Sequence, residues 1–336
     1  MKAWQIVSKG EFRLVEKDGT VDSGEVKVKV NKAALACTDL ELYKGQGNAM
    51  FPIVPVMSAV GQISEGSELA GLQKGERVVL YPYEMDPDTT YNKKRVLAPD
   101  VKIMGLDTDG FLCDFVTVPH EKAYILPEGV SDSAALFTEY IALGIKVIEA
   151  LHVEKGQYIT ILGANTIGNI IAQLALYYQI VPVLIDTDQS KLDLAQSYGV
   201  YYTVNPTNAN VGDRIKEITG GEMAEYCVYE IRGGMSPNYA TAITKETGTV
   251  VVVGHHLENE TVNFNLCDIL EKQLSVIGVK NGYGEFYSAI NLLANRAIKT
   301  DGLVDVEIEF EDVPRKFQEL AEVETRIPYQ KVVVKC

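Results

Sequence analysis

The feature that most constrains the fold is a run without a single charged residue, from Tyr158 to Ile185. Its length alone would allow it to span a bilayer. However, glycines, amides and a proline divide it into an apolar segment at 158–162, a glycine-containing turn, a helical segment and a second apolar segment at 181–185. Parallel strands that are buried on both faces have continuous apolar sequences of this kind. The run therefore predicts a buried strand–helix–strand unit and no membrane partner.

The same alternation of apolar strands and helical patterns continues along the chain. Further strands are expected at 201–204, 226–230, 249–253 and 275–279, with helices at 191–197 and 211–219 among them. Strands separated by helices are typical of a parallel sheet with helices on both faces. The sequence thus predicts an α/β fold with a doubly wound parallel sheet.

The flanking parts of the chain have a different texture. Short strand signals punctuated by Gly and Pro lie at 26–30, 77–81 and 115–118. They favour an antiparallel, barrel-like β domain. A helix is expected at 131–151, capped by Ser131 or Ser133, and the tail predicts helices at 286–296 and 314–322 and a strand at 331–335. We therefore predict one domain formed by residues 1–145 plus 286–336 and a second, inserted domain formed by residues 146–285.

Charge and cysteine usage exclude several classes of partner. The chain has 31 Lys and Arg against 46 Asp and Glu, a formal net charge of −15, which disfavours nucleic acid and anionic membranes as partners. The five cysteines are widely spread and contain no Cys-x-x-Cys pair, so free thiols in a reducing compartment are expected. The first residues lack the apolar core of a signal peptide. We expect a cytoplasmic protein that acts on a small molecule.

A cofactor site is indicated by the turn after the first strand of the α/β region, Gly163-Ala164-Asn165-Thr166-Ile167-Gly168. The dinucleotide fingerprint has three glycines, and here Asn165 replaces the middle one. Asn tolerates a positive φ better than most residues, so the departure is mild. The N–H groups that open the next helix, at Thr166 and Ile167, would face a pyrophosphate.

The acidic residue of the fingerprint is also present. Asp186 ends the second strand, 23 residues after Gly163, close to the expected spacing of about 20 for the acid that binds the ribose. A carboxylate there accepts hydrogen bonds from a ribose diol and repels a 2′-phosphate. Asp188 adds negative charge, so NAD is favoured over NADP. Lys191 is assigned to the same site.

Taken together, the motifs of the whole chain resemble the medium-chain dehydrogenase/reductase superfamily, which includes the zinc-type alcohol and polyol dehydrogenases. The matching segments, in family order, are Thr38-Asp39-Leu40, Tyr43-Lys44-Gly45, Phe51-Pro52-Ile53-Val54-Pro55, Lys74-Gly75-Glu76-Arg77-Val78, Gly110-Phe111, Leu126-Pro127-Glu128-Gly129-Val130, the dinucleotide turn, Val253-Gly254 and Lys331-Val332-Val333. The resemblance implies a GroES-like β domain that carries an inserted Rossmann domain, with catalysis in the cleft between them. It also implies that Val253, Gly254 and Lys331 contribute to the cofactor site.

The zinc ligands of that family are largely missing. Ala36 stands where the family has a cysteine ligand, with Cys37 one residue later, and Met57-Ser58 replace the family's His-Glu. Only Glu139 matches a ligand position, and no cysteine lies in the segment between Val79 and Gly110 where a structural zinc is expected. Zinc needs three or four converging ligands. We therefore expect no metal site and no zinc.

Three residues remain as catalytic candidates. Thr38 matches the proton-relay hydroxyl of the family. Glu139 in an apolar cleft would suit acid–base work, and the equally weighted alternative is a carboxylate paired with a nearby Lys or Arg. Cys37 is either a cleft thiol or, as we expect more often, a small buried cysteine. Asp39 is expected to organise its loop.

His255 and His256 follow a strand end, where one of them would approach the nicotinamide, but two exposed loop histidines are the favoured interpretation. The triplet Lys93-Lys94-Arg95 either binds a phosphate or is a solvated run of charge.

The first hypothesis for function is an NAD-dependent, zinc-independent oxidoreductase that transfers hydride at a carbinol or carbonyl carbon of a small alcohol, polyol or sugar derivative. The alternatives are an NAD(P)H-dependent reductase of conjugated C=C bonds and a nucleotide-binding protein without turnover. A homodimer or homotetramer is expected, joined through the strand at 275–279.

Overall fold

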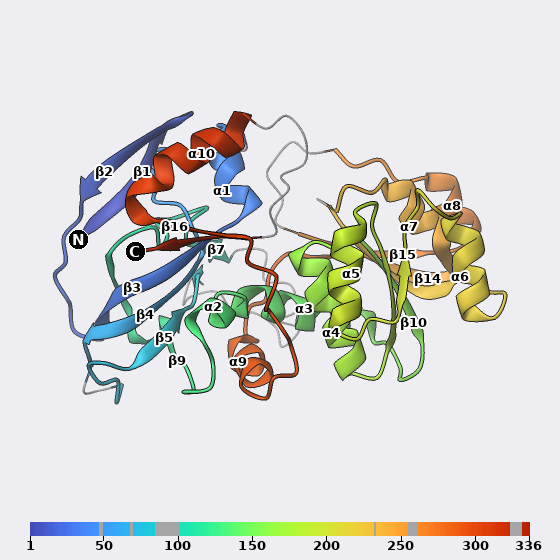
Figure 1. Cartoon of the computed structure of the whole chain (residues 1–336), viewed down its shortest axis with the longest axis horizontal. Coiled ribbons are helices and arrows are strands. Elements are labelled where there is room, and N and C mark those ends of the chain that lie inside the picture. Colours follow the sequence, from blue (N-terminus) through green and yellow to red (C-terminus); the bar gives the residue numbers. More distant parts are fainter. Residues whose placement is uncertain (47–49, 68–69, 85–100, 232, 255–260, 323–330) are drawn as a thin grey trace.

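A computed structural model describes residues 1–46, 50–67, 70–84, 101–231, 233–254, 261–322 and 331–336. Two sheet-containing lobes lie side by side, and helices α3 (Thr138–Leu151) and α9 (Phe286–Ala294) lie between them (Figure 1). No helix in these ranges is both long enough and apolar enough to cross a bilayer.

The second lobe is built on a six-stranded parallel sheet in the order β12-β11-β10-β13-β14-β15. Its strands are β10 (Tyr158–Leu162), β11 (Val181–Ile185), β12 (Tyr202–Val204), β13 (Ala224–Glu230), β14 (Thr244–Val253) and β15 (Ser275–Val279). Its helices are α4 (Thr166–Tyr177), α5 (Gln189–Ser197), α6 (Val211–Thr219), α7 (Pro237–Ile243) and α8 (Leu266–Glu271). The uncharged run is β10, α4 and β11, which confirms the predicted strand–helix–strand unit.

The first lobe is centred on a seven-stranded mixed sheet with the path β16-β17-β3-β4-β5-β9, in which β8 also pairs with β3. These strands are β3 (Glu25–Leu35), β4 (Ser58–Glu65), β5 (Arg77–Leu80), β8 (Phe115–Pro119), β9 (Ala123–Ile125), β16 (Val306–Glu309) and β17 (Val332–Lys335). Two small sheets pair β1 (Lys2–Ser8) with β2 (Glu11–Glu16) and β6 (Tyr83–Glu84) with β7 (Lys102–Ile103). The remaining elements are α1 (Cys37–Tyr43), η1 (His120–Lys122), α2 (Asp132–Ala135), η2 (Phe310–Asp312) and α10 (Val313–Glu322).

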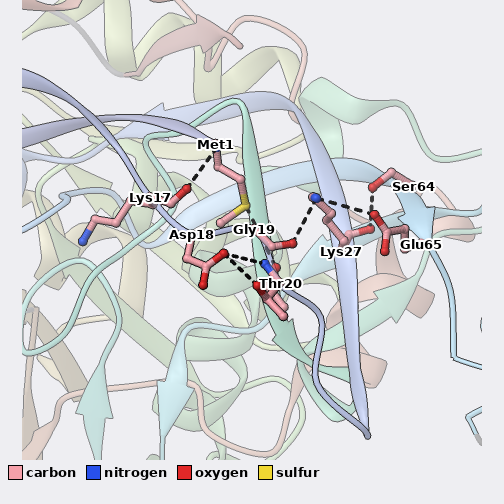
Figure 2. A network of polar contacts seen from close by, with 9 residues as sticks. Met1, Lys17, Asp18, Gly19, Thr20, Lys27, Ser64 and Glu65 are labelled. Atoms are coloured by element: carbon pink, nitrogen blue, oxygen red, sulfur yellow. Dashed lines mark hydrogen bonds and ion pairs between the residues drawn. The ribbon is translucent and has the colours of Figure 1, made fainter.

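The N-terminal segment is tied to this sheet by a network of polar contacts (Figure 2). The Lys27 ammonium on β3 donates to the Gly19 carbonyl at 3.0 Å and lies 3.5 Å from Glu65 on β4. Ser64 Oγ donates to the carbonyl of Lys27 at 3.0 Å. The Asp18 carboxylate accepts from the N–H and the hydroxyl of Thr20, which stabilises the intervening turn and lowers the pKa of Asp18.

The helix expected at 131–151 is in fact two helices. Ser131 caps α2 by accepting from the N–H of Ala134 at 3.1 Å, as the sequence suggested. Phe137 then leaves the helical conformation, with φ −94° and ψ 1°, and α3 starts at Thr138. Leu136 and Phe137 are both fully buried. The break between α2 and α3 thus coincides with the burial of these two apolar side chains. The helical periodicity of the sequence did not predict this break.

One hydrophobic cluster extends across both lobes. It joins Val60 and Val79 of the first sheet to Ile159 and Leu184 of the second through residues of α3, such as Ile141. Helix α3 also crosses residue 145, where the sequence placed a domain boundary. The division into 1–145 plus 286–336 and 146–285 stays a prediction, and the shared core indicates that the two lobes stabilise one another.

Candidate active site

The loop that enters α1 is held by a buried carboxylate. Asp39 has no exposed surface, and its Oδ2 accepts from the N–H of Ala36 at 2.6 Å while its Oδ1 accepts from the N–H of Val56 at 2.9 Å. Val56 has a φ of +79°, a strained conformation for a β-branched residue. The two hydrogen bonds to a charged acceptor fix the loop against the strained segment that leads into β4.

The two residues before Asp39 differ sharply in exposure. Thr38 is 2% exposed, and its Oγ1 has no hydrogen-bond partner within the described residues. Leaving a buried hydroxyl unsatisfied costs about 1–3 kcal/mol, so such groups are typical of sites that receive a ligand. Cys37 is exposed, which contradicts the expectation of a small buried cysteine. It is the first residue of α1.

Glu139 stands in the first turn of α3 and is 2% exposed. Its Oε1 accepts from the Tyr83 hydroxyl at 2.8 Å, and that hydroxyl accepts from the N–H of Gly282 at 3.0 Å. Burial raises the pKa of Tyr83 well above its ordinary value, and the charge of Glu139 acts in the same direction. Tyr83 therefore stays protonated and donates. Tyr83 was not predicted from the sequence, because its strand β6 is only two residues long and has no recognisable periodicity.

The donors at the family's zinc position do not fit zinc. Ala36 offers no side-chain ligand, Met57 is 2% exposed inside the hydrophobic core, and Ser58 Oγ donates to the carbonyl of Leu136 at 2.6 Å. Across the described ranges, no group of three or more His, Cys, Asp or Glu side chains is arranged to hold a metal ion. A carboxylate already bound by Tyr83 and one exposed thiol fall short of tetrahedral coordination.

A buried lysine lies close to Glu139, Asp39 and Cys37. Lys331 is 3% exposed, and its Nζ donates to the Tyr140 hydroxyl at 2.8 Å and lies 4.1 Å from the centroid of that ring. Burial lowers the pKa of Lys331 to about 8, and the negative charges of Glu139, Asp39 and Cys37 act in the opposite direction. The structure thus places Lys331, which the resemblance assigned to the cofactor, among the catalytic candidates. Sequence reasoning missed its partner Tyr140.

The dinucleotide turn opens α4 at the carboxyl end of β10. Gly163 has a φ of +107°, and a Cβ there would lie 2.7 Å from the Cα of Gly233. A Cβ on Gly168 would lie 1.9 Å from the carbonyl oxygen of Gly163. Both positions therefore require glycine, as the fingerprint predicts. The N–H groups of Thr166 and Ile167 lie in the first turn of α4, and first-turn N–H groups suit an anion.

Asn165 occupies the middle position for a different reason from the one expected. Its φ is −69°, so no positive φ is needed. Its Oδ1 caps α4 by accepting from the N–H of Gly168 at 3.2 Å, and its Nδ2 donates to Oε2 of Glu230 at 2.5 Å. Glu230 ends β13, is 5% exposed and was missed from the sequence. Since the chain crosses from one side of β10 to the other between β12 and β13, this pair lies at the topological switch point where such sheets bind ligands.

The acid of the fingerprint is locked into its loop. Asp186 has no exposed surface, and its Oδ2 accepts from the N–H of Ala164 at 2.7 Å while its Oδ1 accepts from the N–H of Asp188 at 2.9 Å. Asp188 is exposed and caps α5, and its hydrogen bond from the Ser190 hydroxyl lowers its pKa. Lys191 is buried, with its Nζ 4.0 Å from Oδ2 of Asp188.

The remaining predicted residues lie at the end of β14 or outside the described part. Val253 is the last residue of β14, and Gly254 follows with a φ of +140°; a Cβ there would lie 2.7 Å from Cγ1 of Ile231. His255 and His256 fall outside the described residues, as do Lys93, Lys94 and Arg95.

Comparison with known proteins matches two family models in chain order. Residues 22–128 match the alcohol dehydrogenase GroES-like domain, and residues 166–295 match the zinc-binding dehydrogenase family. A sorbitol dehydrogenase of Halalkalibacterium halodurans is 25% identical over 314 residues, which cover 89% of each chain.

Solved structures agree with the fold. An alcohol dehydrogenase of Escherichia coli CFT073, complexed with NADH, superposes with a TM-score of 0.85 at 21% identity over 100% of this chain and 99% of that one. A protein of Sinorhizobium meliloti 1021 bound to NADP gives a TM-score of 0.87 at 22% identity with the same coverage. With both family models in place, in order and on the expected fold, the chain belongs to the medium-chain dehydrogenase/reductase superfamily.

Proposed function

We propose that this protein is an NAD-dependent oxidoreductase that transfers hydride at a carbinol or carbonyl carbon of a small polyol, alcohol or sugar derivative, without zinc. The observation that carries the proposal is the pairing of two features in one fold. A glycine turn that suits a dinucleotide opens α4, and a buried polar cluster lies at the start of α3. Helix α3 packs against α4, with Gly144 of α3 facing Leu174 of α4. The cofactor turn and the cluster are thereby held by two helices in direct contact.

The residues at the switch point fit a nicotinamide dinucleotide. The start of α4 supplies N–H donors and the positive end of the helix dipole for a pyrophosphate. When bound, the nicotinamide ring supplies or accepts the hydride. Thr38 contributes a hydroxyl that is buried and unpartnered within the described residues, so it can hydrogen-bond to the reacting oxygen of a substrate.

The preference for NAD rests on two carboxylates at the end of β11. The exposed carboxylate of Asp188 would accept hydrogen bonds from a ribose diol and, with the buried charge of Asp186 behind it, would repel the additional phosphate of NADP. Both oxygens of Asp186 already accept from backbone N–H groups, so Asp186 contributes through its charge. The structural relatives hold NADH in one case and NADP in the other. Dissociation constants for NADH and NADPH, measured by fluorescence titration, should differ by at least about tenfold in favour of NADH, which corresponds to about 1.4 kcal/mol.

Zinc independence rests on the donor set. Ala36, Met57 and Ser58 leave zinc with Glu139 and Cys37 as its protein ligands, and Tyr83 already binds Glu139. Purified protein should contain well under one equivalent of zinc, and chelator should leave turnover unchanged. Stoichiometric zinc, or activity abolished by chelator and restored by zinc, would contradict this part of the proposal.

The activity itself is tested by following NADH absorbance with polyols, their ketoses, simple alcohols and conjugated enones. The similarity to a sorbitol dehydrogenase supports polyols and ketoses as the substrates that turn over. Turnover of enones alone would replace the proposal with C=C reduction. NADH binding without turnover of any of these classes would replace it with a nucleotide-binding role.

A further inference from the structure

The middle residue of the dinucleotide turn is its most exposed residue. Asn165 is half-buried, whereas the other five residues of 163–168 are buried. The fingerprint has glycine at this position so that the backbone can approach the pyrophosphate closely. A side chain at position 165 therefore lies beside the expected pyrophosphate, and it must either obstruct the phosphates or bind them.

The orientation of the Asn165 side-chain amide is fixed by two partners. Its Oδ1 accepts from the N–H of Gly168 at 3.2 Å, and its Nδ2 donates to Oε2 of Glu230 at 2.5 Å. The reverse orientation would place a donor against an N–H group and an acceptor against a carboxylate, so it is excluded. An amide nitrogen has two N–H donors, and within the described residues one of them has a partner, Glu230. The turn therefore holds a second, available donor.

The carboxylate of Glu230 lies where three strands of the parallel sheet end. Glu230 is the last residue of β13 and is 5% exposed. A Cβ on Gly233, which follows β13, would lie 3.2 Å from Oε2, and one on Gly254, which follows β14, would lie 3.9 Å from Oε1. Asn165, which follows β10, binds the same carboxylate. The hydrogen bond thus ties the cofactor turn across the switch point to a strand on the other side.

Charge alone would make Glu230 a poor neighbour for a pyrophosphate, because like charges repel in a partly buried site. The Asn165 amide, however, is bound to the carboxylate and has a donor to spare. A side chain whose conformation is already fixed loses little entropy when it binds a ligand. A carboxylate that orients a donor and a carboxylate that merely repels the ligand have opposite consequences when the charge is removed.

We propose that Asn165 binds the pyrophosphate of the dinucleotide through the second N–H of its side chain, and that Glu230 is the positioning residue that holds this amide in place. The inference rests on the nicotinamide dinucleotide of the function proposed above. Asn165 then supplies with a side chain what the fingerprint supplies through the close approach of a glycine backbone. Strand β13, through Glu230, contributes to the placement of the phosphates.

The first test uses ADP-ribose, which contains the pyrophosphate, and adenosine, which has no phosphate. Asn165→Gly completes the three-glycine fingerprint, and glycine is itself an accepted N-cap residue. Even so, this variant should raise the dissociation constant of ADP-ribose about tenfold or more, because a hydrogen bond to a charged ligand is lost. The dissociation constant of adenosine should change less than about threefold. Calorimetry measures both without turnover.

Asn265→Gly is the control for the loss of a capping asparagine. Asn265 caps α8 by accepting from the N–H of Cys267 at 3.1 Å. This variant should bind ADP-ribose and adenosine as wild type does. Binding of ADP-ribose by Asn165→Gly that is as tight as wild type, or tighter, would overturn the proposal, since the asparagine would then only occupy the place of the glycine.

The second test removes the positioning residue. Glu230→Ala should weaken ADP-ribose binding about tenfold, and the double variant with Asn165→Gly should be no weaker than Asn165→Gly alone, because the two residues act as one unit. Glu230→Gln retains a carbonyl oxygen that can accept from Asn165, so its dissociation constant should stay within about threefold of wild type. Tighter binding in either Glu230 variant, or additive effects in the double variant, would show that the carboxylate only repels the ligand.

A third measurement observes the amide itself. In protein labelled with ¹⁵N at asparagine side chains, the Asn165 signal is identified by its loss in Asn165→Gly. One of its protons should be shifted downfield in the free protein and should move upfield in Glu230→Ala. Its other proton should move downfield when ADP-ribose binds, and no movement of that proton would overturn the proposal.

The proposed function can fail separately. Wild-type protein that shows all these effects with ADP-ribose but turns over no substrate would overturn hydride transfer and support the Asn165–Glu230 pair. Wild-type protein that binds neither NADH nor ADP-ribose would overturn the proposed function and this role together.

Discussion

Asp39 and Lys331 are neighbouring buried groups that differ in how they are satisfied by hydrogen bonds. Asp39 is fully buried, and each of its carboxylate oxygens accepts a hydrogen bond from a backbone N–H group. These two hydrogen bonds hold the loop that enters α1. Lys331 is almost as buried and has one hydrogen-bond partner among the described residues. Burial alone therefore does not show how a charged side chain is satisfied, because two almost equally buried charges differ in the hydrogen bonds that they make.

The lowered pKa of Lys331 predicts how stability depends on pH. In the unfolded chain the lysine has a pKa near 10.5, and in the folded protein about 8, so between these values the unfolded state binds more protons. The free energy of unfolding should therefore rise with pH from about 8 to 10.5, by up to about 3 kcal/mol from this residue. Urea unfolding of wild type and Lys331→Met across this range isolates the contribution, since other groups cancel in the difference. Parallel curves for the two proteins would contradict it.

At the level of elements, the cofactor turn shows packing overriding helix propensity. Gly168 lies inside α4, where alanine is favoured over glycine by about 1 kcal/mol. A Cβ at this position would meet the Gly163 carbonyl oxygen at 1.9 Å, a backbone atom that no rotamer change can move. The helix would have to shift away from β10. The close approach of helix and strand therefore decides the residue.

Gly168→Ala should destabilise the protein by about 2 kcal/mol or more and weaken NADH binding, since the shift moves the N–H donors of α4. Gly212→Ala is the matched control, because Gly212 also lies inside a helix, α6, but its Cβ would find ordinary contacts of 3.5 and 3.6 Å. Helix propensity should then decide the outcome, and the free energy of unfolding of the Gly212→Ala control should rise by up to about 1 kcal/mol. Chemical denaturation measures both. Equal effects at the two positions would show that the turn is not closely packed.

At the scale of the whole molecule, the parallel sheet ends in β15, which among the described residues is paired on one side, with β14. Strand β15 is last in the sheet order, and Val276 on it is 40% exposed. On the adjacent helix α8, Leu266 and Leu270 are 64% and 68% exposed. An exposed edge with apolar side chains beside it is typical of a surface that pairs with another strand. A homodimer joined through β15 remains our prediction.

Val276→Asp should convert such a dimer to monomer, because strand pairing across a two-fold axis would bring two carboxylates together. Tyr201→Asp is the control, since Tyr201 is 80% exposed beside β12 at the opposite edge of the sheet. Light scattering over a range of concentrations measures the mass. A wild-type monomer at every concentration, or a Val276→Asp dimer, would refute assembly through this edge.

Local sequence patterns determined the α/β fold and most of its elements. Apolar runs, glycine turns and capping residues act over a few positions, so the strands at 158–162, 181–185 and 275–279 and the turn at 163–168 could be predicted directly. The break between α2 and α3 could not, because it accompanies the burial of Leu136 and Phe137 in a core that other parts of the chain complete.

Only the tertiary structure decided what the site contains. Lys331 and Tyr140 are 191 positions apart, and the pairing of β17 with β3 brings them together. Tyr83 reaches Glu139 across 56 positions, and Asn165 reaches Glu230 across 65. The physical reason is that a side chain's partner depends on sheet register and helix packing, which no short segment encodes. The sequence thus determined the glycine turn at 163–168, whereas the fold decided which polar side chains lie around Glu139 and Lys331.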